Sequence, residues 1–522
     1  MHRLLTSTRH KLARMVAEMV VEPWNSPVLI TLLAFLVVVI TVLVSTRRGS
    51  NAPPSPRGLP VVGHLHLLGS LPHRSLRSLA ASHGPVMHLR LGRVPTVVAS
   101  SAAAAEEAMK TRDLDFAGRP RLLMVDRFYY GTGGIGFAPY GDHWRQARRV
   151  CAVHMLSARR VASLGRVRAQ EAAALAGRIS GSGGVVNLSD SLAVYSNAVI
   201  SRCTLGDADC VVEGGGARLR KAFGEMEELL GTVPMGETVP WLRWVDTVTG
   251  LERRARRVFE EMDGLLERVI ADHRQRRRAA AAATGDEDEE DFVDVMLDAD
   301  ELDTDSIKSI ILDVLAAATA TTFALLEWAM AELINHPHEM RRLQAEVRAA
   351  VGPGAGAVVT EAHLPRLPYL RAVINETLRL HPPSPLLLPR ETLEDTRLLG
   401  YDVPAGTRVL INAWAIGRDP ATWGPRAEEF APERFVGYGG AGQDFSFLPF
   451  GAGRRGCPGV EFAMLSNELA LASLVHGFDW ELPGGRSPPV DMSELYGLSV
   501  CLKAPLLLVA KPWSSIDMDG VE

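Results

Sequence analysis

The sequence predicts a mainly α-helical protein with small β-sheets (an α+β class), built as one large domain behind a transmembrane helix. Three observations support this fold class. Most of the chain after residue 64 carries a helical repeat of apolar residues. Residues 85–100 carry a hairpin pattern, and residues 28–44 form an uncharged apolar run. We therefore divide the chain into a flank (1–27), a transmembrane anchor (28–44), a basic and proline-rich hinge (45–64) and one domain (65–522).

The apolar run from Val28 to Val44 has the properties of a membrane anchor. A spanning helix needs about 17–25 apolar residues, so this run is short but sufficient. Arg47 and Arg48 follow it, whereas a signal peptide would end in a small-residue cleavage site. We therefore expect an uncleaved anchor, with a cleaved signal or a buried helix as the alternatives. Basic residues on its two sides balance and do not fix its orientation.

The proline-rich segment Pro53 to Pro60 (PPSPRGLP) comes next. It cannot form a helix, because proline removes backbone donors and biases the residue before it to extended geometry. We interpret it as a stiff spacer, with a flexible linker as the alternative.

Two elements of the large domain have defined ends. Pro85 to Ser100 holds two alternating runs around Gly92-Arg93 and predicts a hairpin. The longest helix is predicted from about Asp305 to Asn335, where His336-Pro337 stops it. Between them, Ala279 to Asp291 is alanine-rich and then acidic, so we expect a solvated surface loop there.

The composition is that of a globular protein with a sizeable core. Apolar residues make up 47% of the chain and charged residues 22%, which excludes a disordered or collagen-like protein. The net charge is −5, from 56 basic and 61 acidic residues, so no basic field favours nucleic acid as a partner. Five cysteines without a CxxC pair argue against a disulfide framework and for a reducing compartment, which favours a cytosolic domain.

The glycine-rich loop from Pro449 to Gly459 (PFGAGRRGCPG) is the most informative stretch, and a helix is predicted after it from Val460 to Leu474. The helix N-terminus and loop N–H groups would stabilise a thiolate at Cys457 and lower its pKa. Glycines let a flat ligand approach the backbone, and a nearby arginine can pair with an anion. No second Cys or His lies at zinc spacing. Alone, the loop could hold a phosphate or a reactive thiol.

Three further motifs precede this loop. Glu376 and Arg379 (ETLR) lie at i, i+3 on one face of a helix, and Arg434 (PERF) could join them. Trp144 and Arg148 (WRQAR) lie four residues apart, again on one face. Each motif alone is weak, because such pairs are usually surface contacts of little energy.

In this order, with the cysteine loop last, these motifs resemble the cytochrome P450 family, in its membrane-bound plant branch. The resemblance covers about residues 53–512. The loop matches the family signature Phe-x-x-Gly-x-Arg-x-Cys-x-Gly at Phe450, Gly453, Arg455, Cys457 and Gly459. The resemblance implies the cytochrome P450 fold and haem b as cofactor. It also implies a monooxygenase that takes electrons from NADPH through a membrane-anchored flavoprotein reductase.

The resemblance also implies individual roles. Cys457 would be the axial ligand of the haem iron, and in this enzyme class that thiolate favours O–O cleavage. Glu376, Arg379 and Arg434 would form a buried structural triad. The expected donors to the haem propionates are Trp144, Arg148 and Arg455, with Arg119 and Arg390 as further candidates that could instead lie on the surface.

The predicted central helix departs from the family pattern Ala/Gly-Gly-x-Asp/Glu-Thr. Its sequence there is Ala317-Ala318-Thr319-Ala320-Thr321, so the expected catalytic threonine, Thr321, is kept and Ala320 replaces the acid. In the family this acid–threonine pair relays protons to bound dioxygen, a general-acid role. Water held by Thr319, Thr321 or Thr322 could substitute, oxygen activation could be slow, or alanine is simply tolerated.

The substrates would be O₂ and a small apolar molecule. Segments that match the family's substrate-facing stretches are mostly apolar and aromatic. Their candidate contacts, each of which could equally be ordinary packing, are Phe128, Tyr129, Ala317, Leu387 and Leu498. Arg145, Arg149 and Arg454 could form a basic patch for an acidic electron donor, or only a solvated face.

We therefore expect a monooxygenase anchored in the endoplasmic reticulum membrane, with membrane lipid as a partner and the domain in the cytosol. The metabolite would be of indole, terpenoid or phenylpropanoid type. Segments that begin at Leu59, Phe137 and Val490 look most like the grass branch with indole and benzoxazinoid oxygenases. Two alternatives remain: an oxygen-independent haem-thiolate isomerase or dehydratase, motivated by Ala320, and a non-enzymatic haem sensor.

Overall fold

The computed structural model describes the large domain and little of the chain before it. The residues described are 31, 33–36, 51–131, 134–206, 215–282, 292–298, 302–352, 358–438 and 444–513. The predicted flank (1–27) and most of the predicted anchor (28–44) lie outside the described residues.

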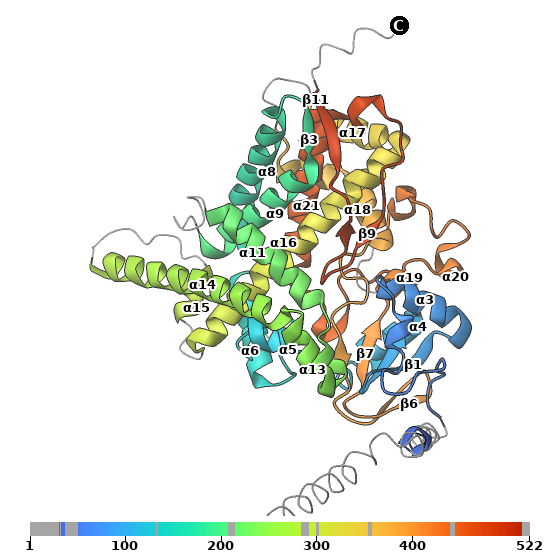
Figure 1. The fold of residues 1–522 in the computed structure, drawn as a ribbon. Helices are drawn as coiled ribbons and strands as arrows, with labels where there is room; N and C mark the ends of the chain where they lie inside the picture. The colour runs from blue at the N-terminus through green and yellow to red at the C-terminus, as the bar shows by residue number, and fades with distance from the viewer. Residues whose placement is uncertain are drawn as a thin grey trace, which may run out of the picture.

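Long helices occupy the centre of the molecule and small sheets lie at its periphery (Figure 1), which confirms the predicted fold class. The helices of twelve or more residues are α3 (Pro72–His83), α6 (Asp142–His154), α8 (Gly165–Ser180), α9 (Leu188–Leu205), α11 (Gly215–Gly231), α14 (Leu251–Ala282), α16 (Thr304–Asn335), α17 (Pro337–Val351), α18 (Pro368–Leu380) and α21 (Val460–Gly477). The shorter ones are α4 (Ala102–Glu106), α5 (Leu123–Phe128), α7 (Ala158–Ser163), α12 (Met235–Thr238), α13 (Arg243–Val248), α15 (Phe292–Asp298), α19 (Ala413–Ile416) and α20 (Pro420–Trp423).

The predicted central helix is confirmed as α16. The side chain of Asp303 accepts a hydrogen bond from the backbone N–H of Ser306 at 2.8 Å and caps the first turn. At the other end His336 leaves the helical conformation, and Pro337 begins α17 at the position where a missing N–H costs nothing. Within the described part of the chain, α16 alone is long and apolar enough to cross a membrane, but most of its apolar stretch is buried against other elements, so it is a core helix.

The predicted hairpin is confirmed as β1 (Val86–Leu91) and β2 (Val94–Ala99), which pair antiparallel. Gly92 turns the chain with a positive φ of 62°, and a Cβ there would lie 2.2 Å from the carbonyl oxygen of Thr238. β7 (Arg408–Ile411) adds to β2 in parallel, and β4 (Arg390–Glu391) closes the order β1-β2-β7-β4. The other pairings join β5 (Thr396–Leu398) to β6 (Tyr401–Val403), β9 (Glu494–Leu495) to β10 (Cys501–Leu502), and β11 (Leu507–Pro512) to β3 (Val185–Asn187) and β8 (Phe478–Glu481).

The proline-rich segment is not helical, as predicted, and it packs on the domain. Pro53 and Pro56 are buried. The backbone N–H of His88, in β1, donates to the carbonyl of Pro54 at 2.7 Å. These contacts hold the segment beside the sheet that contains β1, so its described residues are packed against the domain.

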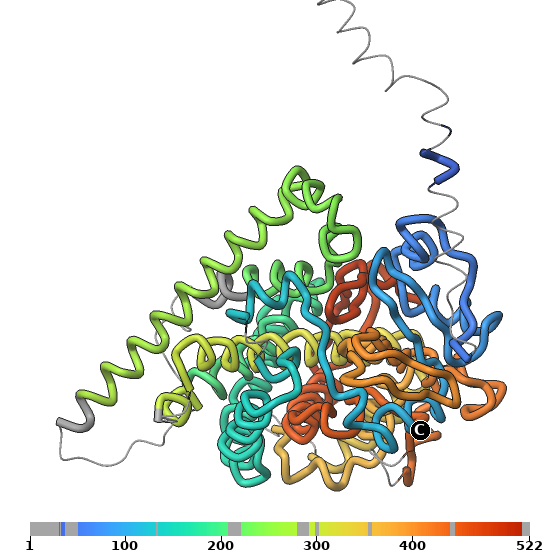
Figure 2. Tube along the Cα trace, turned by 90° about the horizontal axis from the view of Figure 1, so that it is seen from below, coloured from blue at the N-terminus to red at the C-terminus, as the bar shows by residue number. Residues whose placement is uncertain are grey.

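The alanine-rich start of the predicted surface loop is helical instead. Residues 279–282 continue α14, because alanine has the highest helix propensity, and residues 283–291 lie outside the described residues. α14 has 32 residues, about 48 Å at 1.5 Å per residue, and its far end extends away from the other helices (Figure 2).

Candidate active site

A cavity of about 280 Å³ lies beside the middle of α16, and Cys457 forms part of its wall. Its lining comes from segments far apart in the sequence: the chain around Ile135, helices α11 and α16, residues 383–390, the cysteine loop and residues 498–499. Most of the lining is apolar, with a few charged side chains. This is the composition of a small-molecule site.

The cysteine loop is held by its own backbone. The N–H of Cys457 donates to the carbonyl of Phe450 at 2.9 Å, and α21 begins three residues later at Val460. Gly453 has a φ of 69°, and a Cβ there would lie 2.2 Å from the carbonyl oxygen of Met109. Only glycine therefore fits at this point. Phe450 and Gly459 line the cavity, whereas Gly453 lies behind the loop against Met109.

Cys457 is enclosed by protein, yet its side chain stays accessible because it borders the cavity. Burial raises the pKa of its thiol, and the N–H of Gly459 and the charge of Arg148 offset only part of that rise. The expectation that the helix N-terminus and the loop lower this pKa is therefore wrong for the free thiol, because desolvation of the thiolate is the larger effect. A thiolate at this position needs a further positive charge, such as a metal ion.

Four arginines meet at the same cavity: Arg119, Arg148, Arg390 and Arg455. Arg119 and Arg390 are only 7% and 3% exposed, so the surface alternative for them is wrong. Arg119 donates to the carbonyls of Gly136, Leu388 and Pro389 at 2.7 to 2.9 Å. The four arginines come from four different parts of the chain: the segment before α5, helix α6, strand β4 and the cysteine loop.

The electrostatics of this arginine cluster favour an anionic ligand. Burial, together with the charges of Arg390 and Arg148, lowers the pKa of Arg455 to about 9. Burial also lowers the pKa of Arg390 to about 10, although Asp113 lies 3.5 Å away. Arg455 donates to the carbonyls of Ala117 and Ala138, but its buried Nη1 has no hydrogen-bond partner among the described residues.

These observations test whether haem fits. Its two propionates would add negative charge beside the four guanidinium groups, of which Arg390 already has Asp113 at 3.5 Å. Its iron would supply the positive charge that a buried thiolate of Cys457 needs, and the glycines leave the loop backbone open to a flat ligand. The donor set therefore fits haem.

Trp144 and Arg148 lie on α6 (Asp142–His154) at the edge of the cluster. The indole N–H of Trp144 donates to the carbonyl of Ile135 at 3.1 Å, and the guanidinium of Arg455 lies 4.3 Å from the centre of its ring. Trp144 is not among the described residues that line the cavity. Arg148 does line it and donates to the carbonyl of Gly456 at 2.8 Å.

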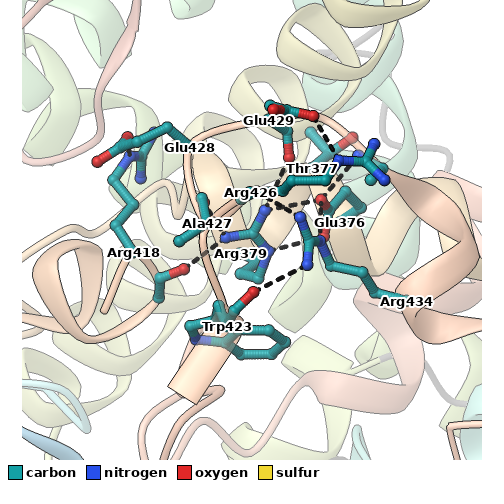
Figure 3. A network of polar contacts seen from close by, with 12 residues as sticks. Glu376, Thr377, Arg379, Arg418, Trp423, Arg426, Ala427, Glu428, Glu429 and Arg434 are labelled. Carbon is teal, nitrogen blue, oxygen red and sulfur yellow. Dashed lines mark hydrogen bonds and ion pairs between the residues drawn. The ribbon is translucent and has the colours of Figure 1, made fainter. Parts of the chain in front are cut away.

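Glu376, Arg379 and Arg434 form one polar network, in which the first two are buried and Arg434 is half-buried (Figure 3). Glu376 and Arg379 are both fully buried and share two hydrogen bonds of 2.7 Å. Arg434 lies 3.4 Å from the same carboxylate. Arg379 also donates to the carbonyls of Gly417 and Ala427 at 2.6 Å each. The network therefore ties α18 to the loops on both sides of α20.

The middle of α16 runs along the cavity, and Ala317 and Thr321 line it. The hydroxyl of Thr321 donates to the carbonyl of Ala317 at 2.7 Å, one turn earlier. Ala320 has no polar side chain to offer, and the buried hydroxyl of Thr319 has no hydrogen-bond partner among the described residues.

Four of the five candidate substrate contacts line the cavity: Tyr129, Ala317, Leu387 and Leu498. Phe128 is fully buried in the core and is not among the described lining residues. Two further lining residues, Glu227 and Asp313, were not predicted as site residues. For Asp313, the available signal is an acidic residue within an otherwise apolar stretch of the predicted central helix.

Comparisons with known proteins agree with this geometry. The family model described as Cytochrome P450 matches residues 53–509. The chain is 44% identical over 497 residues to (+)-menthofuran synthase of Mentha piperita, covering 92% of this chain and 98% of that protein. It is 45% identical over 508 residues to cytochrome P450 71A2 of Solanum melongena, covering 94% and 99%.

Solved structures give the same result for the fold. A zebra fish cytochrome P450 determined with abiraterone superposes with a TM-score of 0.72 at 27% identity, covering 85% of this chain and 100% of that one. A zebra fish cytochrome P450 structure with progesterone superposes with a TM-score of 0.70 at 26% identity, covering 85% of this chain and 99% of that one.

The relatives are plant proteins, as the motifs suggested, whereas the narrower likeness to grass indole and benzoxazinoid oxygenases stays a prediction. The family carries haem, with iron bound by a cysteine thiolate and electrons delivered by a reductase. The match over nearly the whole described domain, with the cysteine and the arginines at one cavity, shows that this chain is an oxygenase of the cytochrome P450 family.

Proposed function

We propose that this protein is a haem-thiolate monooxygenase that inserts one oxygen atom into a hydrophobic plant secondary metabolite of indole, terpenoid or phenylpropanoid type. The observation that carries the proposal is the meeting of Cys457 with four arginines at one largely apolar cavity, where the buried Nη1 of Arg455 has no hydrogen-bond partner among the described residues. The relative named (+)-menthofuran synthase supports a small apolar product.

Each lining group has a defined task in this proposal. Bound haem supplies the redox chemistry that activates dioxygen. Cys457 ligates the iron, Arg119, Arg148, Arg390 and Arg455 bind the propionates, and Trp144 stacks on Arg455 to hold its guanidinium in place. The apolar wall positions the metabolite and excludes bulk water.

Proton delivery rests on hydroxyl groups, because Ala320 brings no carboxylate. Thr321 lines the cavity, and the hydroxyl of Thr319 is a buried donor on the same helix. Water bound at Thr321, or at Thr322, which also lines the cavity, would carry the protons that dioxygen reduction consumes.

The test uses microsomes that contain this protein and a plant reductase, incubated with metabolite extracts with and without NADPH. We expect NADPH-dependent products that are one oxygen atom heavier. The Cys457→Ser variant should lose these products and the carbon monoxide difference spectrum of a thiolate-ligated haem. Oxygenated products that persist in Cys457→Ser would contradict the assignment of the ligand.

The replacement of the family's acid by Ala320 favours a second candidate function, one that does not activate dioxygen. An isomerase or dehydratase with the same haem needs neither O₂ nor reductant. Rearranged or dehydrated products formed equally with and without NADPH would favour it over the monooxygenase. Full haem occupancy with no turnover of any metabolite would favour a haem sensor.

We also propose that the domain faces the cytosol from the endoplasmic reticulum membrane, held by the predicted anchor. Exposed apolar side chains support a membrane-facing side. Trp241, Trp244 and Val248 are 60% to 76% exposed, and Leu59 and Val61 are exposed as well. The turn between β1 and β2 connects the two groups, because the N–H of Arg93 donates to the carbonyl of Thr238 at 2.8 Å and the N–H of Gly92 donates to the carbonyl of Val62 at 3.1 Å. Large aromatic side chains are favoured at membrane interfaces.

Protease added to intact microsomes tests this location. The cytosolic orientation predicts digestion of the domain without detergent, and carbonate washing should leave the full chain in the pellet. Protection of the domain until detergent is added would place it in the lumen.

The reductase is proposed to dock near the cysteine loop. The guanidinium groups of Arg145 and Arg454 lie 5.3 and 5.6 Å from the centre of the Tyr140 ring. Arg149 is exposed on the same helix as Arg145. Charge reversal at Arg145 and Arg149 should slow electron transfer more at low salt than at high salt, because exposed charges are screened.

A further inference from the structure

Glu227 is a carboxyl that the site described so far does not use. It lies on α11 and lines the same cavity as Cys457. Both of its carboxyl oxygens are buried, and neither has a hydrogen-bond partner among the described residues. A buried polar group without a partner costs free energy, and the cost is larger for a charge.

The other carboxyl of the cavity, Asp313, shows the contrast. One of its oxygens accepts hydrogen bonds from the N–H groups of Ile135 and Gly136 at 2.7 Å each, and the positive charge of Arg119 acts on it. Asp313 therefore has its partners inside the protein and holds the chain around Ile135 to α16. Glu227 has no such structural task.

No cation offsets the charge of Glu227 within the described residues. Burial and, to a smaller extent, the negative charge of Asp313 raise its pKa to about 8. The next residue, Glu228, forms two hydrogen bonds with Arg254 at 2.8 and 2.6 Å on the surface. The carboxyl that faces outward is thus paired, and the carboxyl at the cavity is not.

The backbone keeps Glu227 close to the cavity. α11 ends at Gly231, where a Cβ would lie 2.6 Å from the backbone of Gly497 and Leu498. Leu498 itself lines the cavity. This close contact fixes the end of α11 against the cavity wall, so a molecule in the cavity can supply the donor that Glu227 lacks.

We infer that Glu227 determines specificity by binding an N–H or O–H group of an otherwise apolar substrate, with a protonated amine bound most strongly. The inference rests on the proposed function, and it narrows the substrate class to apolar metabolites that carry one donor group. Hydrogen bonds to charged groups are the strong ones, so an ammonium gains more than a hydroxyl.

Binding of three shape-related probes to the purified holoprotein tests the inference. The probes are N,N-dimethyl-4-phenylbutylamine, its carbon isostere (5-methylhexyl)benzene, and 4-phenylbutan-1-ol. We expect Glu227→Gln to weaken binding of the amine roughly 10- to 100-fold and to leave the affinity for the hydrocarbon within about twofold. Glu227→Leu should weaken binding of the alcohol as well, because leucine offers no acceptor.

Glu228→Gln is the matched control on the same helix and should change none of the three affinities. The hydrocarbon affinity and the haem content of each Glu227 variant report whether its cavity is intact. An equal loss for amine and hydrocarbon, or no loss for any probe, would overturn the inference. Absence of NADPH-dependent oxygenation in a protein that still selects the amine would refute the proposed function and leave the inference standing.

Discussion

Glu376→Gln is the sharpest test of the network formed by Glu376, Arg379 and Arg434. The substitution keeps the shape of the side chain and removes the negative charge that Arg379 and Arg434 share. One oxygen of Glu376 also accepts a hydrogen bond from the N–H of Ala431 at 2.9 Å. The new amide N–H₂ would face the N–H groups of Arg379 in place of an acceptor.

The expected loss of stability follows from burial. Glu376 and Arg379 are 0% exposed, and removing one partner of a buried ion pair costs about 3–5 kcal/mol. That is a large part of a typical free energy of unfolding, about 5–15 kcal/mol. Urea titration of the holoprotein should show a lower midpoint with an unchanged slope, followed through the haem absorbance.

Glu429→Gln is the matched control, because Glu429 is 58% exposed and pairs with the equally exposed Arg426 (Figure 3). Exposed pairs contribute little, so its midpoint should not move measurably. Equal shifts of the urea midpoint for Glu376→Gln and Glu429→Gln would refute the reasoning, because it attributes the difference between the two variants to burial of the ion pair.

Three further predictions concern the cavity. Thr321→Ala should lower the amount of product formed per NADPH oxidised several-fold, and Ala320→Asp should raise it. If this ratio is unchanged in both variants, Thr321 does not take part in proton delivery. Because burial raises the pKa of Glu227 to about 8, the folded state holds this proton more tightly than the unfolded chain. Wild-type stability should therefore fall relative to Glu227→Gln as pH rises from about 4.5 to 8, by at most about 1.4 kcal/mol per pH unit; parallel stability curves would contradict this. Gly231→Ala should weaken binding of every cavity ligand, because a Cβ 2.6 Å from the backbone of Gly497 must displace α11 or the loop at Leu498; unchanged affinities would show that the contact relaxes elsewhere.

Local patterns predicted the elements that depend on local physics. α16 begins and ends where the Asp303 cap and Pro337 require it, and the hairpin turns at Gly92. The signature of the cysteine loop indicated haem. Its glycines let a flat ligand approach the backbone, and its arginine can pair with an anionic group, whatever the rest of the fold is. The prediction that the surface loop begins at Ala279 was wrong, also for a local reason. The helix propensity of the alanines extends α14 to Ala282.

Burial and long-range contacts were decided only by the tertiary structure. The motif containing Glu376 and Arg379 is typical of a surface pair until folding encloses it. The pKa of Cys457 depends on desolvation by the surrounding protein. No spacing in the sequence relates Glu227 to a cavity whose lining extends to Ser499, 272 residues away. The sequence by itself determined the family and the position of the cysteine, because these follow from residue type and spacing. Which charges lack a partner is a property of the packed molecule, since it depends on every segment that folding brings against them.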